Sequence, residues 1–145
     1  MIDPVCHVLA WSVGTMSDVS LFEVGLIAGG GAIGAVSRYL IGTGLARTTS
    51  WPGWAGVLIV NLLGCLMIGL AAGSGDAGPW THAFLMTGVC GALTTMSGLA
   101  LDLTVLIWIA AWRQFAWCLG LTLAGGIPLV LIGRAIGEMV WGGVA

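Results

Sequence analysis

The sequence predicts an all-α integral membrane protein with four transmembrane helices. Of its 145 residues, 59% are hydrophobic and 7% are charged, and the mean hydropathy is +1.08. Soluble domains carry roughly 25% charged residues, so the few charges of this chain cannot cover the surface of a soluble globule. Disorder is excluded as well, because a disordered chain has high charge and low hydrophobicity.

Long stretches without charge divide the chain into four spans. A transmembrane helix needs about 20 predominantly apolar residues, and we predict spans at residues 21–45, 55–73, 81–112 and 115–140. The first two joints are rich in glycine, proline and serine, and the third is a tight turn near Arg113 and Gln114. Tryptophans lie at the predicted helix ends, where amphipathic indole rings favour the headgroup region: Trp51, Trp54, Trp80, Trp112 and Trp117.

Residues 1–20 are predicted to be an N-terminal extension without function, followed by one four-helix unit at residues 21–145. The extension is a poor signal peptide, because it has no basic start and Pro4, His7, Gly14 and Asp18 interrupt its apolar run. Met16 is an alternative start of the chain.

The arginines give only a slight bias in orientation. Arg38, Arg47 and Arg113 are predicted on one side of the membrane and Arg134 on the other, and the chain has no lysine. So small a bias is compatible with insertion in both orientations and with antiparallel pairing. Four short helices cannot enclose a pore alone, so we expect a dimer or a larger assembly.

Several classes of function are disfavoured by composition and spacing. A net charge of −2 excludes a basic surface for nucleic acid. No nucleophile–base pair or metal-ligand cluster points to an enzyme. The four cysteines are scattered singly, which indicates buried thiols rather than a disulfide or zinc framework.

The third predicted span contains an unusual stretch of glycines and hydroxyls at residues 88–98. As one continuous helix, residues 81–112 would extend roughly 48 Å, compared with a hydrocarbon core of about 30 Å. The stretch either unwinds or forms a kinked helix whose Ser and Thr side chains bond their own backbone. Unwound backbone at membrane depth must be buried in protein or line a cavity; its free carbonyls suit a cation such as Na⁺, and its hydroxyl and amide protons suit an anion.

Two further features concern polarity and helix contact. Asn61 is the only amide in the second predicted span, and an unsatisfied amide in hydrocarbon costs several kcal/mol. It therefore either serves a function or forms an interhelical hydrogen bond. In the first span, the pairs Gly30/Gly34 and Gly31/Ala35 have the spacing of a close-packing helix face.

Three motifs, in order, resemble those of the Fluc fluoride channels (CrcB proteins). Residues 30–39 (GGAIGAVSRY) resemble the family's GGxxGAxxRY opening, and residues 56–64 (GVLIVNLLG) resemble its GTLxVNxxG. Residues 88–97 (GVCGALTTMS) are similar to its GxxGGxTTFSTF. The resemblance extends over residues 21–137.

The resemblance implies a fluoride-specific channel subunit that passively exports fluoride across the plasma or inner membrane and lowers fluoride toxicity. It implies a broken third helix and an antiparallel, dual-topology dimer with two fluoride pathways, either a homodimer or a heterodimer with a paralogous subunit. It also implies a structural Na⁺ at the dimer centre, bound by the backbone carbonyls of Gly91 and Thr94 from each subunit. Arg38 matches an arginine at a pore vestibule or helix-end anchor.

A pathway for fluoride must replace tightly held water with hydrogen-bond donors, and a fixed cation deep in the pore would hold the ion too tightly. The resemblance assigns the following residues to the pathway: Asn61, Thr94, Thr95, Met96, Ser97, Leu99 and Thr122.

The chain also departs from the family pattern. Met96 and Leu99 stand where the family has two phenylalanines, whose ring edges carry positive potential. Val57, Ala92 and Asp102 replace a threonine, a glycine and a glutamate. We therefore expect the chain to conduct poorly alone and to pair with a paralogue that keeps both phenylalanines.

Two alternatives remain. The chain is a nonconducting structural partner in a heterodimeric channel, or it is a small multidrug-type exporter. The exporter is disfavoured because it needs a carboxylate buried in the middle of a helix, whereas Glu23 lies at a helix mouth and Asp102 well beyond residues 88–98.

Overall fold

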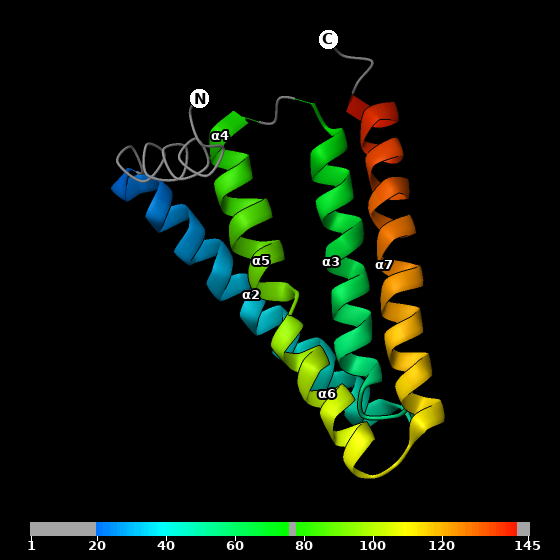
Figure 1. The fold of residues 1–145 in the computed structure, drawn as a ribbon. Coiled ribbons are helices and arrows are strands. Elements are labelled where there is room, and N and C mark those ends of the chain that lie inside the picture. Colours follow the sequence, from blue (N-terminus) through cyan, green and yellow to red (C-terminus); the bar gives the residue numbers. More distant parts are fainter. Residues whose placement is uncertain (1–19, 76–77, 142–145) are drawn as a thin grey trace, which may run out of the picture.

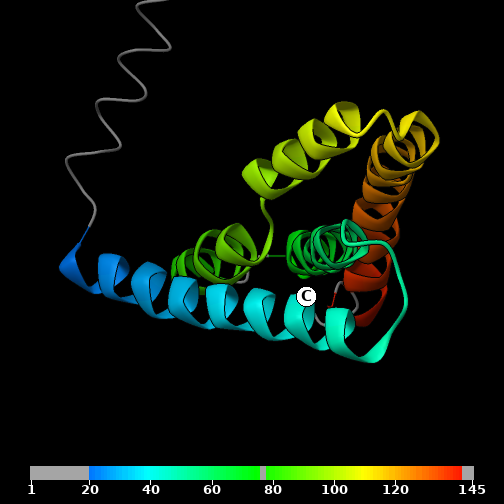
Figure 2. The ribbon, with the colours of Figure 1, turned by 90° about the horizontal axis from the view of Figure 1, so that it is seen from below.

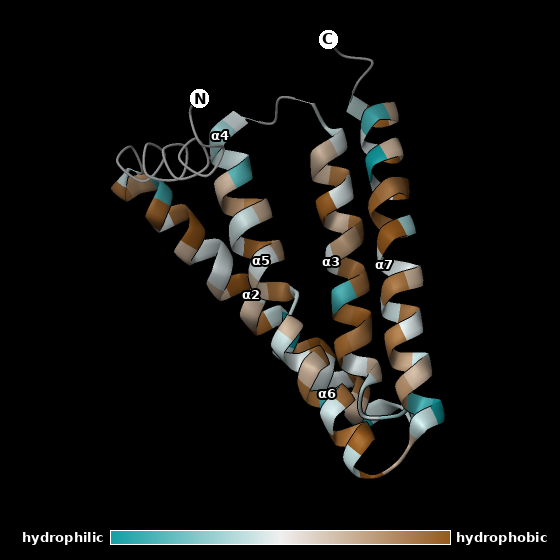
Figure 3. Ribbon diagram, viewed as in Figure 1, coloured by the Kyte–Doolittle hydropathy of each residue, from teal (hydrophilic) through white to brown (hydrophobic). Residues whose placement is uncertain are grey.

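The computed structural model describes residues 20–75 and 78–141, and the described chain is helical apart from short connections (Figure 1). The predicted all-helical class is confirmed, with four helical segments that are long and apolar enough to cross a membrane. Hydrophobic residues run along all four (Figure 3). Residues 1–19 lie outside the described residues, so the predicted extension stays a prediction. The elements are α2 (Leu21–Thr48), α3 (Ala55–Gly73), α4 (Gly78–Thr81), the π-helix η1 (His82–Cys90), α5 (Gly91–Leu93), α6 (Met96–Trp108) and α7 (Trp112–Trp141).

Helix α2 begins at a capping box. The Ser20 hydroxyl accepts a hydrogen bond from the Glu23 amide at 3.2 Å, and the Glu23 carboxylate accepts one from the Ser20 amide at 2.9 Å. This reciprocal pair satisfies two amides at the helix start. The helix extends to Thr48, three residues beyond the predicted end.

The helices form two close pairs. Helix α3 lies beside α7, and α2 packs against η1 and α5 (Figure 1). Helix α6 does not continue along the line of η1 and α5; it is displaced toward the start of α7, which it contacts (Figure 2).

Glycines permit the closest of these contacts. A Cβ on Gly133 of α7 would lie 2.5 Å from the carbonyl oxygen of Leu66 on α3, so no larger residue fits there without movement. Gly30 and Gly34 are the buried glycines of α2 and face η1 and α5, which confirms the predicted packing face for that pair. A Cβ on Gly31 would meet nothing within 4 Å, so Gly31 packs against no described residue of its own chain, and the predicted packing role of Gly31 and Ala35 stays a prediction.

The turn between α6 and α7 lies earlier than predicted. Helix α6 ends at Trp108 rather than at residue 112, and α7 begins at Trp112 rather than at 115. Ala110 is left-handed, with a φ of 53°. Its amide donates to the Ile107 carbonyl at 3.0 Å, and the Ala111 amide donates to the Leu106 carbonyl at 2.9 Å. These two bonds are a Schellman motif, which normally places glycine at the left-handed position; with alanine there, the sequence carried no stop signal.

We expect Ala110→Gly to stabilise the fold by about 0.5–1 kcal/mol. A left-handed alanine brings its Cβ too close to the next carbonyl, and glycine removes that strain. The measurement is the thermal unfolding midpoint of the purified protein in detergent.

The matched control is Ala111→Gly. Ala111 does not have a positive φ, and it packs against the cluster that contains Leu106. Its substitution by glycine should lower the unfolding midpoint. Equal midpoints for the two variants would contradict strain at Ala110.

Candidate functional site

Two extended residues, Thr94 and Thr95, separate α5 from α6. Their φ and ψ angles are −78° and 150° for Thr94, and −146° and 114° for Thr95. We call them the extended pair. They lie within the predicted stretch 88–98, and only α5 separates them from the π-helix η1, a type of irregularity that is frequent at functional sites.

Asn61 of α3 holds the extended pair through both groups of its side-chain amide. Its Oδ1 accepts a hydrogen bond from the Thr95 amide at 2.8 Å, and its Nδ2 donates to the Thr95 carbonyl at 3.3 Å. Of the two alternatives for this residue, the structure contains the interhelical hydrogen bond. A primary amide has two N–H groups, so one donor of Nδ2 remains for another partner.

The hydroxyl of Thr95 caps the start of α6. Its Oγ1 accepts a hydrogen bond from the Gly98 amide at 3.0 Å, which is the bond that an N-cap residue provides. The same oxygen lies 3.0 Å from the Ser97 hydroxyl oxygen. The Thr94 hydroxyl instead donates to the Cys90 carbonyl at 3.0 Å. The Thr94 hydroxyl is therefore bonded to the last residue of η1, and the hydroxyls of Thr95 and Ser97 lie at the start of α6.

These bonds affect two backbone carbonyls, those of Gly91 and Thr94. In a continuous α-helix, the amide four residues further on would donate to each of them. For the Gly91 carbonyl, that amide is the one of Thr95, which donates to Asn61 Oδ1 instead. For the Thr94 carbonyl, it is the amide of Gly98, which donates to the Thr95 hydroxyl oxygen instead. Among the described residues there is no group of three His, Cys, Asp or Glu side chains that could hold a metal. The two carbonyls are those that the resemblance assigns to Na⁺, and that assignment stays a prediction.

Met96 and Leu99, both on α6, lie in different environments. The Met96 side chain is 77% exposed at the first position of α6. Leu99 is 5% exposed and belongs to a core cluster with Leu106 and Cys118. The assignment of both residues to one pathway stays a prediction, and within this subunit only Met96 lies on an open face.

Thr122 and Arg38 lie on the two longest helices. The Thr122 hydroxyl, on α7, donates to the Cys118 carbonyl of its own helix at 2.7 Å. Arg38 is half-buried on α2 and forms no ion pair with any residue that the structure describes. The predicted roles of both residues remain predictions.

One polar feature was not anticipated from the sequence. The Oδ2 atom of Asp102, on α6, is buried and has no hydrogen-bond partner among the described residues. A carboxylate within an apolar span is the signal that could have identified it. From the sequence, Asp102 was considered as a replacement for glutamate and as a carboxylate too far from residues 88–98 for an exporter, and its burial was not predicted.

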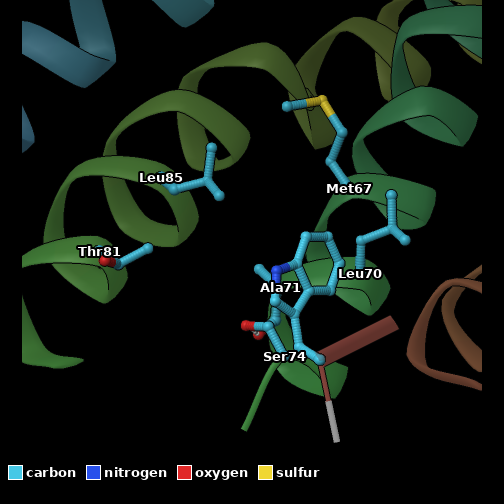
Figure 4. Close-up of a pocket in the computed structure, with 7 residues that line it drawn as sticks. Met67, Leu70, Ala71, Ser74, Thr81 and Leu85 are labelled. Atoms are coloured by element: carbon cyan, nitrogen blue, oxygen red, sulfur yellow. Dashed lines mark hydrogen bonds between the residues drawn. The ribbon is translucent and has the colours of Figure 1, made fainter. Parts of the chain in front are cut away.

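One cavity does not include any of these groups. It has a volume of about 570 Å³ and opens between α3, η1 and the end of α7 (Figure 4). None of the predicted site residues lines it, and its walls are mostly apolar. The lining residues are Met67, Leu70, Ala71, Ser74, Thr81, Leu85 and Trp141.

Gly64→Ala should disturb the extended pair. A Cβ on Gly64 would collide with Cγ2 of Thr94. The branched Thr94 side chain cannot turn away without losing its bond to Cys90. We expect a loss of about 1–3 kcal/mol in the free energy of unfolding, measured as a lower thermal midpoint.

Gly120→Ala on α7 is the control, because a Cβ there would meet nothing within 4 Å. It should leave the midpoint unchanged or raise it slightly, since alanine favours helix. Equal effects at the two positions would show that Thr94 does not depend on the space at Gly64.

Comparison with known proteins gives a consistent match. The family model described as CrcB-like protein, Camphor Resistance (CrcB), matches residues 25–134, a range that includes α3, the extended pair and α6.

Individual relatives match over most of their length. The chain is 41% identical to the fluoride-specific ion channel FluC of Ruegeria sp. over 114 residues, covering 74% of this chain and 87% of the relative. It is 38% identical to that of Nitratidesulfovibrio vulgaris over 123 residues, covering 79% and 96%. It is 37% identical to the fluoride-specific ion channel FluC 1 of Lactiplantibacillus plantarum over 117 residues, covering 80% and 99%.

Proposed function

Because this chain belongs to the CrcB-like protein family and is a multi-pass membrane protein, we propose that it is a subunit of a fluoride-specific ion channel. The channel exports fluoride passively across the cell membrane and thereby lowers its concentration in the cytoplasm. The observation that carries this proposal is the match of the chain to relatives named as fluoride-specific ion channels over most of their length.

The polar groups at the extended pair support the proposal. Fluoride is small and tightly hydrated, so a pathway must offer hydrogen-bond donors in place of water. The second N–H of Asn61 is a donor of this kind, and so is one hydroxyl of the Thr95–Ser97 pair, since the other donates within the pair. These groups lie in the interior of two apolar helical segments. All are neutral, so they can release the anion again.

The proposed structural cation is Na⁺, held by the carbonyls of Gly91 and Thr94 from each subunit. Unwound backbone carbonyls and the C-terminal ends of broken helices coordinate Na⁺ in membrane proteins. The fit of these residues rests on the two diverted amides, which leave both carbonyl oxygens without their usual helical donors. When bound, Na⁺ would supply positive charge that ties two subunits together.

The proposed assembly is an antiparallel dual-topology dimer, with a third helix interrupted at the extended pair in each subunit. The slight bias of the arginines supports insertion in both orientations. We propose that the partner is a paralogous subunit that keeps both phenylalanines, because Met96 and Leu99 lack aromatic ring edges.

A nonconducting structural partner is the second candidate. The observation that favours it is the burial of Leu99 within the core of its own subunit. A side chain in that position presents nothing to an ion.

Transport by reconstituted liposomes tests the proposed function. Liposomes that contain this chain, alone or with its paralogue, should release fluoride and not chloride when a potassium ionophore balances the charge. Equal release of both anions would contradict fluoride selectivity. Fluoride release only in the presence of the paralogue, unchanged when Asn61 of this chain is replaced by alanine, would favour the structural partner.

Phenylalanine substitutions at Met96 and Leu99 should have different effects on stability and on fluoride release. Met96→Phe should change the free energy of unfolding by no more than about 0.5 kcal/mol, because the site is exposed, and it should raise fluoride release by the chain alone. Leu99→Phe should destabilise by about 1–3 kcal/mol through overpacking of the core. Thermal midpoints and fluoride efflux measure both. Fluoride release that rises in Leu99→Phe without loss of stability would show that Leu99 faces the pathway.

A further inference from the structure

The two candidate cation ligands share a property that no other carbonyl of the third segment is seen to have. For each, the amide that would close the helical hydrogen bond is taken by a side-chain oxygen instead: Oδ1 of Asn61 at 2.8 Å and Oγ1 of Thr95 at 3.0 Å. The two ligands, Gly91 and Thr94, are three residues apart, and so are the two diverted amides of Thr95 and Gly98.

An amide hydrogen on a carbonyl oxygen competes with a cation for that oxygen. The hydrogen carries positive partial charge, and it lies along the helix axis beyond the oxygen, where a cation at the end of the helix would sit. A carbonyl that has lost this donor at membrane depth is under-satisfied, which is costly unless another positive group replaces it. Diverting the amide therefore prepares the oxygen for a cation.

We propose that Asn61 and the Thr95 hydroxyl are positioning residues for the Na⁺ site, each of which keeps one amide away from one carbonyl ligand. The inference rests on the proposed function above, which supplies the Na⁺ and the carbonyl ligands. Neither side chain touches the ion. Asn61 acts on Gly91 through the Thr95 amide, and the Thr95 hydroxyl acts on Thr94 through the Gly98 amide.

The second hydrogen bond of Asn61 restricts this positioning role to a side chain that both donates and accepts. Because Nδ2 also donates to the Thr95 carbonyl at 3.3 Å, the side chain engages both backbone groups of Thr95 and fixes its orientation. A residue with only an acceptor or only a donor could not satisfy both. Helix α3 thus sets the geometry of a cation site to which it contributes no ligand.

The test measures Na⁺ binding without transport. The thermal midpoint of the purified protein is recorded in fluoride-free buffer as Na⁺ replaces N-methyl-D-glucamine at constant ionic strength, and the Na⁺ concentration that gives half of the stabilisation is determined. Asn61→Leu removes both the acceptor and the donor of the side chain, and Thr95→Val removes the hydroxyl, whereas Thr95→Ser keeps it.

We expect Asn61→Leu and Thr95→Val to raise the half-stabilising Na⁺ concentration about ten-fold or more, which corresponds to 1.4 kcal/mol. Thr95→Ser should stay close to the wild-type value. Gly137→Ala is the control for general destabilisation, because its Cβ would lie 2.5 Å from the Leu70 carbonyl oxygen, farther along α3 from Asn61. It should lower the midpoint equally with and without Na⁺.

Three results would overturn the inference or its premise, and they are distinguishable. A wild-type protein without any Na⁺-dependent stabilisation would remove the proposed Na⁺ site itself. A wild-type response that both Asn61→Leu and Thr95→Val retain would leave the Na⁺ site in place and overturn the positioning role. If Asn61→Leu does not fold, the threonine pair decides alone: equal Na⁺ responses in Thr95→Val and Thr95→Ser would overturn the inference.

Discussion

The hydrogen bonds between Asn61 and Thr95 are the contact on which the rest of the site depends. Inside a bilayer, every backbone amide and carbonyl released from a helix must find another partner, because no water is available. The extended pair releases such groups in the interior of an apolar segment. A primary amide both donates and accepts, so one asparagine on the neighbouring helix satisfies both backbone groups of Thr95. Without Asn61, a continuous helix would have the lower free energy, because it satisfies these backbone groups within the helix.

This contact requires α3 to lie at a fixed position relative to the extended pair, and close contacts at glycines help to fix that position. Gly133 brings α7 against the carbonyl of Leu66, just over one turn from Asn61, and Gly64 gives room for the Thr94 side chain. On the other side, Gly34 holds α2 against α5, so that the end of the broken segment is fixed from two directions. Each glycine weakens its own helix by about 1 kcal/mol, and close helix contact offsets that loss.

The sequence predicts the helical class, the beginning of α2, both bounds of α3 and the two possible states of Asn61, because hydropathy and residue type determine them locally. It does not predict which face of α6 is buried. Met96 and Leu99 follow the extended pair, and their exposure depends on the direction in which the helix restarts, which tertiary contacts of Thr95 and Asn61 determine. The turn at Ala110 was missed for a related reason: a left-handed alanine is chosen by the bonds around it rather than by its own preference.

The position of the extended pair along its segment bears on the proposed assembly. The third candidate membrane segment is Gly78–Trp108, and the extended pair divides it into parts of roughly 24 Å and 20 Å at the helical rise per residue. A two-fold axis in the membrane plane inverts depth, so only groups near the middle of the bilayer meet their copies across it. Carbonyls at Gly91 and Thr94 meet that condition, whereas an interruption near either end would place the two copies on opposite sides of the membrane. The proposed cation site would thus lie at the depth where an antiparallel pair doubles the number of carbonyl ligands.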